Sequence, residues 1–347
     1  MAAIEHRTPD RVPTDYWAHK PVTERLCAAL GVDDYEGLLT ALGVDIRDVR
    51  NRITYTGPPE HFLPDGRQCD MWGVPLNPGG TYASSVTRTP LSRATTVAEI
   101  EAHTPFPDAD WWDYSPVLSA CEAGGEHAVM GGAWSPFFCQ SMYLMGMEEL
   151  LTAMALYPAA AEALMTRVTD YFLESCRRQF EAAQGTMQIF FMGDDYGGQT
   201  GPLVSLEMFR RFIKPHLARL FAQAKRFGLK VMLHSCGSVY AFLPDLIEIG
   251  MDALDPIQVR AKDMEAERLS REFGKDICFH GSIDTQQTLP FGTPEDVRAE
   301  VRSRLELFSD GGFICGPSQE FMADISTKNI LAMYETAGSM RAGQGQS

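Results

Sequence analysis

Short apolar runs alternate along the chain with longer segments whose apolar positions recur at helical spacing. The apolar runs predict strands at Val12–Trp17, Asp45–Val49, Ala128–Gly132, Met187–Met192, Lys230–His234, Ala253–Pro256, Ile277–His280 and Gly312–Cys315. The helical segments fall at Met147–Leu156, Ala159–Ala183, Leu206–Phe227, Val239–Ile249, Met264–Phe273, Pro294–Phe308 and Thr327–Glu335. Strands interleaved with helices predict a parallel α/β sheet closed as a (β/α)8 TIM barrel, with an open doubly wound sheet as the alternative.

Two parts of the chain depart from this alternation. Residues 50–110 are rich in Pro, Gly and Thr and indicate long loops or a small inserted hairpin, and residues 341–347 (RAGQGQS) have the composition of a frayed tail. We therefore expect a single barrel domain over residues 1–340. No GxGxxG motif follows an early strand, so the pattern gives no support for a dinucleotide site.

The formal net charge of −16 argues against a nucleic-acid partner, because phosphates would be repelled. The chain has no apolar run of the roughly 18 residues that a membrane-spanning helix needs. Its start, MAAIEHRTPDRVPTDYW, lacks a basic-then-apolar signal pattern, and we expect a cytoplasmic protein. The 8 cysteines form no CxxC pair, which indicates reduced and mostly buried thiols, a subset of which can bind metal.

The segment VMLHSCGSVY, residues 231–240, ends a predicted strand in two titratable side chains. Residues i and i+2 of a strand point to the same face, so His234 and Cys236 project together at the carboxyl end, where a barrel gathers functional groups. Gly237 lets the chain turn away sharply. Cys315 ends the apolar run in GGFICGPSQ and offers a third soft ligand. The trio predicts a catalytic zinc site with an open fourth position; ordinary packing is the alternative.

Three segments carry a resemblance to a known family: HSCGSVYAFLPDLIEIGMDALDPIQ, FHGSIDTQQTLPFGTPEDV and MGDDYGGQTGPLVSLEMFRRFIKPH. Together they resemble the uroporphyrinogen decarboxylase superfamily, over roughly residues 9–338 and most strongly after residue 185. The resemblance implies a (β/α)8 barrel whose site lies at the carboxyl mouth of the strands.

Two branches of that superfamily differ in their motifs. Uroporphyrinogen decarboxylases carry an arginine-rich N-terminal motif that holds the substrate carboxylates, whereas the matching residues 13–19 (PTDYWAH) have no arginine pair. The zinc methyltransferases of corrinoid-dependent methyl transfer have a His-x-Cys followed far downstream by a Cys. His234, Cys236 and Cys315 match that pattern, so the resemblance favours the methyltransferase branch with these three residues as zinc ligands.

The methyltransferase resemblance implies transfer of a methyl group between a small methylated substrate, either a methoxylated compound or a thiol, and the cobalt of a corrinoid (cobalamin). No D-x-H-x-x-G cobalamin-binding motif occurs in the chain, so the corrinoid is expected on a separate partner protein. GDDYGGQTGPL and FHGSIDTQ are similar to bacterial members linked to O-demethylation. The direction of transfer and the methyl acceptor stay open.

Other polar residues are expected near the barrel mouth. Asp194 and Asp195 follow a strand, and because neighbours on a strand face opposite ways, one of them faces the cavity as a proton donor, a support for His234 or a labile fourth zinc ligand. His280 ends another strand and is a further catalytic candidate. A loop cap for the aspartates and a core hydrogen bond for His280 are the structural alternatives. Substrate contacts are predicted for Trp134, Tyr196, Gln199 and Gln258.

Two further functions compete with methyl transfer. Decarboxylation of a porphyrinogen-like polycarboxylate needs basic side chains at the mouth, for which the early strands offer Arg11, Lys20 and Arg50. A barrel that binds a tetrapyrrole or corrinoid without turnover is the non-enzymatic alternative. Members of the superfamily often form homodimers, and the sequence does not decide whether this chain does.

Overall fold

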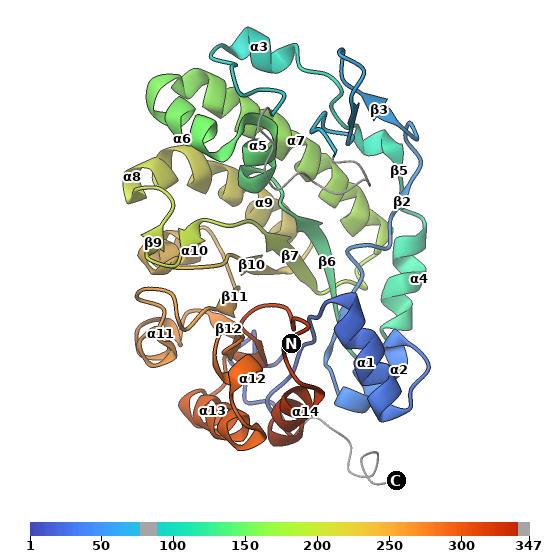
Figure 1. Ribbon diagram of the computed structural model, residues 1–347, viewed down its shortest axis with the longest axis vertical. Coiled ribbons are helices and arrows are strands. Elements are labelled where there is room, and N and C mark those ends of the chain that lie inside the picture. Colours follow the sequence, from blue (N-terminus) through green and yellow to red (C-terminus); the bar gives the residue numbers. More distant parts are fainter. Residues whose placement is uncertain (77–88, 339–347) are drawn as a thin grey trace.

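Seven parallel strands form the centre of the molecule in the computed structural model, which describes residues 1–76 and 89–338 (Figure 1). Their order in the sheet is β1-β6-β7-β10-β11-β12-β13, and all neighbours are parallel. Their bounds are Ile46–Asp48 (β1), Ala128–Trp134 (β6), Ile189–Gly193 (β7), Lys230–His234 (β10), Ala253–Ile257 (β11), Cys278–Ile283 (β12) and Phe313–Pro317 (β13).

The first predicted strand, Val12–Trp17, closes this sheet into a barrel. Thr14 forms a parallel bridge with Cys315 on β13. On the other side, the N–H of Asp45, just before β1, donates to the Thr14 carbonyl at 2.9 Å. The segment therefore lies between the two outer strands of the sheet. The prediction of a TIM-barrel fold is confirmed, with an eighth strand that is reduced to a few backbone contacts.

Helices surround the barrel (Figure 1). Their bounds are Lys20–Leu30 (α1), Tyr35–Leu42 (α2), Val97–Glu101 (α3), Pro116–Ala123 (α4), Phe138–Met145 (α5), Met147–Leu156 (α6), Pro158–Ala182 (α7), Leu206–Met208 (α8), Lys214–Arg226 (α9), Leu243–Glu248 (α10), Ala266–Phe273 (α11), Thr288–Phe291 (α12), Pro294–Leu307 (α13) and Thr327–Thr336 (α14). A π-helical stretch, Phe209–Ile213, joins α8 to α9. The start of α13 follows from its sequence, because Thr293 and Asp296 form a capping box around Pro294.

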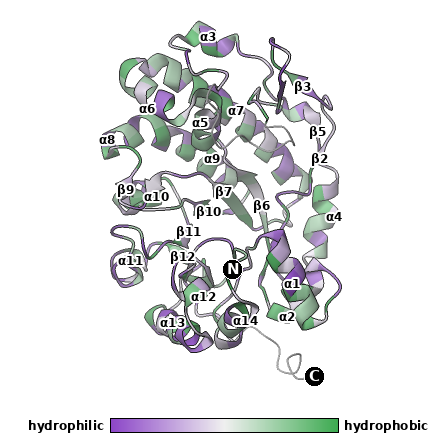
Figure 2. Ribbon diagram, in the orientation of Figure 1, coloured by the Kyte–Doolittle hydropathy of each residue, from purple (hydrophilic) through white to green (hydrophobic). Residues whose placement is uncertain are grey.

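Alternate residues of each strand face two different apolar cores. The core inside the barrel contains Ile46, Met130, Ile189, Phe191, Met232, Ala253, Cys278 and Ile314, together with Ala3 and Ile4 from the start of the chain. The intervening residues, such as Val231 and Leu233, pack under the helices. Figure 2 accordingly colours the central strands as hydrophobic and the helices as mixed. Ala3 and Ile4 fill the floor of the barrel, so the opposite, carboxyl end of the strands is the open mouth.

Small elements interrupt the strand–helix alternation. Between β1 and β6, Thr54–Tyr55 (β2) pairs with Trp112–Asp113 (β5), and His61–Phe62 (β3) with Gln68–Cys69 (β4). After β7, Gly197–Gly198 (β8) pairs with Gly201–Pro202 (β9). The predicted tail at residues 341–347 lies outside the described residues. Within residues 1–76 and 89–338, no helix has the length and apolar character needed to cross a membrane.

Candidate metal centre

The alternation of side chains along the strands brings several polar residues into the mouth. In β10, Met232 faces the interior core, so His234, two residues later, faces the same way. In β7, Phe191 faces the interior, and the same alternation directs Asp195 rather than Asp194 into the mouth. Only one of the two neighbouring aspartates therefore reaches the site, and it is Asp195.

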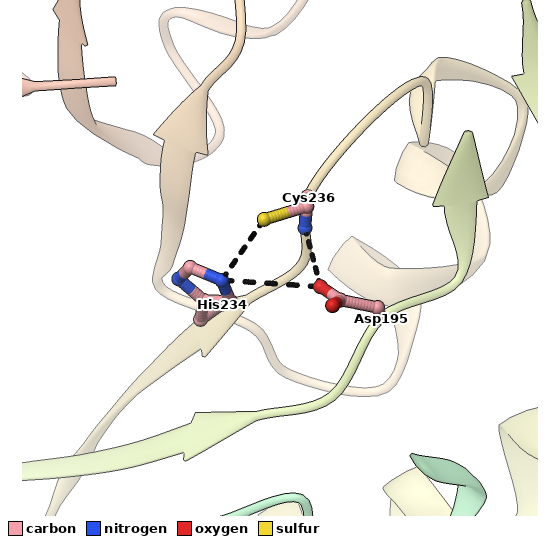
Figure 3. A group of neighbouring side chains, drawn as sticks. All are labelled: Asp195, His234 and Cys236. Atoms are coloured by element: carbon pink, nitrogen blue, oxygen red, sulfur yellow. Dashed lines mark hydrogen bonds and ion pairs between the residues drawn. The ribbon is translucent and has the colours of Figure 1, made fainter. Parts of the chain in front are cut away.

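Asp195, His234 and Cys236 form a cluster in which one ligand atom from each residue lies within 4.8 Å of the others. His234 Nε2 is 3.3 Å from Cys236 Sγ and 3.9 Å from Asp195 Oδ1. The backbone N–H of Cys236 donates to Asp195 Oδ1 at 2.8 Å. Figure 3 shows the imidazole, the sulfur and the carboxylate pointing toward one another from a strand end and two neighbouring loops. Nitrogen, sulfur and carboxylate oxygen are the ligand atoms that zinc takes in proteins.

Asp255 on β11 fixes the orientation of His234. Its Oδ2 lies 2.6 Å from Nδ1 of the imidazole, which leaves Nε2 directed at Cys236. The imidazole is buried, and burial alone would lower its pKa, but the Asp255 carboxylate and the Cys236 sulfur raise the pKa of His234 to about 10. A carboxylate behind a histidine is the usual support of a metal ligand, because it sets which ring nitrogen carries the proton.

His280 lies behind Asp255 and does not touch the cluster. Its Nδ1 pairs with the second oxygen of Asp255, and its Nε2 is 3.1 Å from Oδ2 of Asp15. Asp15 also accepts a hydrogen bond from Trp17 Nε1 at 3.0 Å. Burial opposes the charge, but the Asp255 and Asp15 carboxylates raise the pKa of His280 to about 10. His280 is thus a buried cation between two carboxylates and supports Asp255 from behind, away from the cluster where it was predicted to act.

Aromatic rings cover one side of the cluster. The Trp17 ring stacks on His234, with centroids 5.7 Å apart and planes 5° apart, and the Trp134 ring centroid lies 4.8 Å from the imidazole. Trp134 ends β6 and is 51% exposed, so one face of this ring is open to the mouth. The Arg50 guanidinium lies 4.1 Å from the centre of the Phe191 ring. The cluster is therefore shielded from water on this side by a wall of stacked rings.

A cavity of about 810 Å³ opens beside this wall. Its aromatic lining consists of Tyr16, Trp17, Tyr35, Trp72, Trp112, Trp134, Tyr143, Tyr171 and Phe172. Among the described residues that line it, Arg50 is the one Lys or Arg, and its guanidinium is paired with Asp48 at 2.6 Å. Asp15 and Glu320 add acidic groups. The described lining is therefore rich in aromatic rings and has no unpaired cation.

Cys315 does not join the cluster, which corrects its prediction as the third ligand. On β13, Ile314 faces the interior core, whereas Phe313 and Cys315 face outward and pack under the helices. The thiol is fully buried there, and burial raises the pKa of Cys315 to about 12. Within the described residues, the third ligand position is taken by Asp195.

Asp194 and Tyr196 also lie away from the mouth. The Asp194 carboxylate accepts hydrogen bonds from three backbone N–H groups at the start of α5, those of Phe137, Phe138 and Cys139, at 3.3, 2.8 and 2.7 Å. It therefore caps the start of α5 and does not point into the mouth. Tyr196 is completely buried against Phe137 and Phe138, so its prediction as a substrate contact is corrected too.

Three glutamines lie around Cys236 and the loop that carries it. Gln199 Nε2 donates to Gln258 Oε1 at 3.3 Å, and the same oxygen accepts the Gly237 N–H at 2.8 Å. Both predicted residues therefore hold the loop that carries Cys236. Gln258 and Gln319 also line a smaller cavity of about 200 Å³. Gln319 donates its Nε2 to Cys236 Sγ at 3.0 Å.

Sequence reasoning missed Asp15, Asp255 and Gln319. A signal for Asp255 was present, because it is a carboxylate within an otherwise apolar strand, and the structure pairs it in register with His234. Asp15 likewise lies within the closing segment, next to the bridging residue Thr14. Gln319 lies in a loop after β13, where no periodic pattern points to its position.

Comparison with known proteins gives a consistent set of relatives. Residues 80–340 match the model of the family described as uroporphyrinogen decarboxylase (URO-D). A methylated-thiol–coenzyme M methyltransferase of Methanosarcina mazei is 28% identical over 52% of this chain and 46% of that protein. A uroporphyrinogen decarboxylase of Mycobacterium ulcerans is 30% identical over 41% of this chain and 40% of that protein. The chain spans a little under half the length of these curated relatives.

Solved structures extend the similarity to the whole fold. A methyltransferase from Methanosarcina mazei superposes with a TM-score of 0.65 over 97% of this chain and 96% of that chain, at 18% sequence identity. At this identity the match establishes the shared barrel and leaves the chemistry to be argued from the site.

Proposed function

The chain belongs to the uroporphyrinogen decarboxylase family, and from this premise we propose that it is a zinc-dependent methyltransferase. In this proposal it moves a methyl group between a small methylated substrate and the cobalt of a corrinoid carried by a separate protein. The observation that carries the proposal is the cluster of Asp195, His234 and Cys236 at the barrel mouth. The similarity to a protein named as a methyltransferase of methylated thiols supports the reaction class.

The donor atoms of the cluster fit zinc. His234 Nε2, Cys236 Sγ and Asp195 Oδ1 would hold the ion, and three protein ligands are the number found at catalytic zinc sites, which keep a position for substrate. When bound, zinc supplies a Lewis acid that polarises a methyl ether oxygen or keeps a substrate thiol deprotonated.

The surrounding residues prepare the cluster for that role. Asp255 holds a proton of His234 on Nδ1, so Nε2 is the nitrogen that would bind a metal once its own proton is displaced. Trp17 covers the imidazole face and excludes water. The exposed ring of Trp134 offers a surface for the non-reacting part of a substrate in the neighbouring cavity.

Decarboxylation of a polycarboxylate is the second candidate, because several curated relatives carry the name uroporphyrinogen decarboxylase. The charges at the mouth argue against it. Arg11 is bonded to Asp45 at 2.9 Å, and Arg50 is bonded to Asp48. Lys20 has an 87% exposed side chain. A substrate with many carboxylates needs unpaired cations in its cavity, and these three basic residues do not provide them.

Metal analysis of purified variants tests the zinc proposal. We expect about one zinc per chain in the wild type, and loss of most of that zinc in Cys236→Ala and Asp195→Ala, because each removes a ligand. Cys315→Ala is the control: it also removes a cysteine thiol, but one that is buried and faces away from the cluster, and it should retain zinc. Wild-type protein without zinc, or zinc lost only in Cys315→Ala, would contradict the proposal.

A methyl-transfer assay separates the remaining alternatives. The zinc-containing protein is mixed with free cob(I)alamin and a panel of methoxylated compounds, or with methylcobalamin and small thiols, and the cobalamin spectrum is followed. We expect turnover with at least one panel and none with Cys236→Ala. Cobalamin binding without any spectral conversion would favour a barrel that binds the corrinoid without turnover. Release of CO2 from a porphyrinogen would favour decarboxylation as the function.

A further inference from the structure

The side-chain amide of Gln319 lies against the sulfur of Cys236. Its Nε2 is 3.0 Å from Sγ, in a contact that joins the loop after β13 to the loop after β10. The residue before it is anchored, because the N–H of buried Ser318 donates to the Ile283 carbonyl at 2.7 Å. The amide therefore reaches the sulfur from a backbone position that β12 and β13 fix together.

The orientation of this amide is set by its other end. Oε1 of Gln319 accepts the backbone N–H of Glu320 at 3.0 Å. A carboxamide has one acceptor end and one donor end. Exchanging them would place the amide oxygen against the sulfur and the NH2 group against a second donor. The hydrogen-bond network thus directs the donor end at Cys236.

We propose that Gln319 is a positioning residue that donates a hydrogen bond to the Cys236 thiolate and so limits the nucleophilicity of that sulfur. The inference rests on the proposed function, in which Cys236 is a zinc ligand beside the place where methyl groups are exchanged. A thiolate is itself a good nucleophile. A hydrogen bond from a neutral amide draws on its lone pair, which leaves the sulfur as a metal ligand and slows its own methylation.

In this inference, Gln319 suppresses methylation of the Cys236 sulfur, a displacement in which one bond forms and one breaks. The sulfur lone pair forms an S–C bond to the methyl carbon, and the bond from that carbon to its leaving group breaks with its electron pair. Methyl iodide reproduces this step outside the natural reaction, with iodide as the leaving group. In the zinc-containing protein the sulfur is deprotonated by the metal in every variant, so the rate of this step reports on nucleophilicity alone.

The experiment compares three full-length zinc-containing proteins: the wild type, Gln319→Met and Gln286→Met. Zinc content is measured first, and methylation of Cys236 by methyl iodide is then followed by peptide mass spectrometry. Gln319→Met keeps the length of the side chain and removes the donor, so we expect methylation about five- to tenfold faster, the factor for one lost hydrogen bond. Gln286 lines the same small cavity and should leave the rate unchanged.

A second readout uses Co2+ in place of zinc. We expect the sulfur-to-cobalt charge-transfer band to move to lower energy in Gln319→Met, because the thiolate lone pair is no longer stabilised, and to stay in place in Gln286→Met. Equal methylation rates in all three proteins, a slower rate in Gln319→Met, equal acceleration in both variants, or an unmoved band would each overturn the inference.

The outcomes distinguish this inference from the proposed function. A wild-type protein that takes up no zinc ends the proposed function and this inference with it. A wild type with one zinc per chain whose Cys236 reacts no more slowly than in Gln319→Met ends only the role of Gln319.

Discussion

Asp255 controls how strongly a proton competes with a metal for His234. The carboxylate helps to raise the pKa of the imidazole to about 10, so the ring carries two protons at neutral pH in the metal-free protein. A metal must displace the proton on Nε2 before it can bind. Below pH 10, the apparent metal affinity therefore gains up to about a factor of ten per pH unit from this proton alone.

The substitution Asp255→Asn tests this competition. Without the carboxylate, burial lowers the pKa of His234, and the ring binds metal above pH 7 without releasing a proton. Between pH 7 and pH 9 we expect the logarithm of the apparent zinc affinity to rise with pH in both proteins. The slope should be smaller in the variant than in the wild type by about one log unit per pH unit. Competition with a chelator at several pH values measures both slopes.

Parallel slopes in the two proteins would show that Asp255 does not hold a proton on His234. Asp252→Asn is a suitable control, because this aspartate immediately precedes β11 and accepts a hydrogen bond from the Val231 N–H and not from the imidazole. It should leave the slope of the wild type unchanged.

Whether a residue of the site faces the barrel interior could be predicted only where the sequence shows which residues of its strand point inward. The spacing of His234 and Cys236 fixes their common face from sequence alone. Which face Cys315 takes depends on whether Ile314 or its neighbours fill the barrel, and all of them are apolar or soft. The same uncertainty applied to Asp194 and Asp195, where the sequence required one inward residue and packing decided which.

The contact between α7 and α9 contains a histidine that is kept neutral. His216 lies in the first turn of α9, and its Nδ1 is 3.0 Å from Oγ1 of Thr169 on α7, whose hydroxyl donates to the Met165 carbonyl at 2.7 Å. The ring therefore donates to Thr169. Burial lowers the pKa of His216 to about 4, with a smaller contribution from Arg219.

The pH dependence of unfolding tests this packing. Because the folded pKa of His216 lies below its ordinary value of 6.5, the neutral ring stabilises the fold above that pH, and this contribution is lost as the pH falls through about 4. His216→Asn keeps a donor toward Thr169 and does not titrate. Between pH 7 and pH 4.5 we expect the wild type to lose up to about 3 kcal/mol more of its free energy of unfolding than the variant. Urea unfolding at both pH values measures it, and identical losses would refute it.

Among the elements, length and periodicity decided what could be predicted. α6 and β10 have the predicted bounds, α7 is shifted by one residue at both ends, and α13 ends one residue earlier than predicted. The helices α2, α4 and α5 have 8 residues each and were not singled out, because two turns give too few positions to establish a period. Their formation depends on tertiary packing and caps, such as the Asp194 carboxylate at the start of α5.

Residues 3 and 4 fill the floor of the barrel and so contribute to the stability of the whole fold. Ile4 is 4% exposed and packs with Ile46, Met130 and Ile189 in the interior core. We expect Ile4→Ala to lower the free energy of unfolding by about 2–4 kcal/mol, the usual cost of a cavity in a closed core. Leu156→Ala, at a position that is 66% exposed, should change it by less than about 0.5 kcal/mol. Urea unfolding of both variants checks the difference, and a neutral Ile4→Ala would mean that the floor is not part of the folded core.

At the scale of the molecule, the alternation of strands and helices was enough to predict a barrel, because right-handed crossovers leave few other ways to bury both faces of a parallel sheet. The alternation could not predict how the segment at Thr14 closes the barrel between β13 and β1. The segment at Thr14 pairs through isolated bridges and carries polar residues, so its place between β13 and β1 follows from the geometry of the other seven strands.

That closure ties the beginning of the chain to its end. Asp15 and Trp17, which hold His280 and cover His234, belong to the segment that pairs with residue 315, and that partner is translated 301 codons after Thr14. On a translating ribosome, Asp195, His234 and Cys236 are all made while this partner is still missing. A message cut short before the codon for Cys315 therefore yields a polypeptide with every ligand of the cluster and an unclosed wall around them.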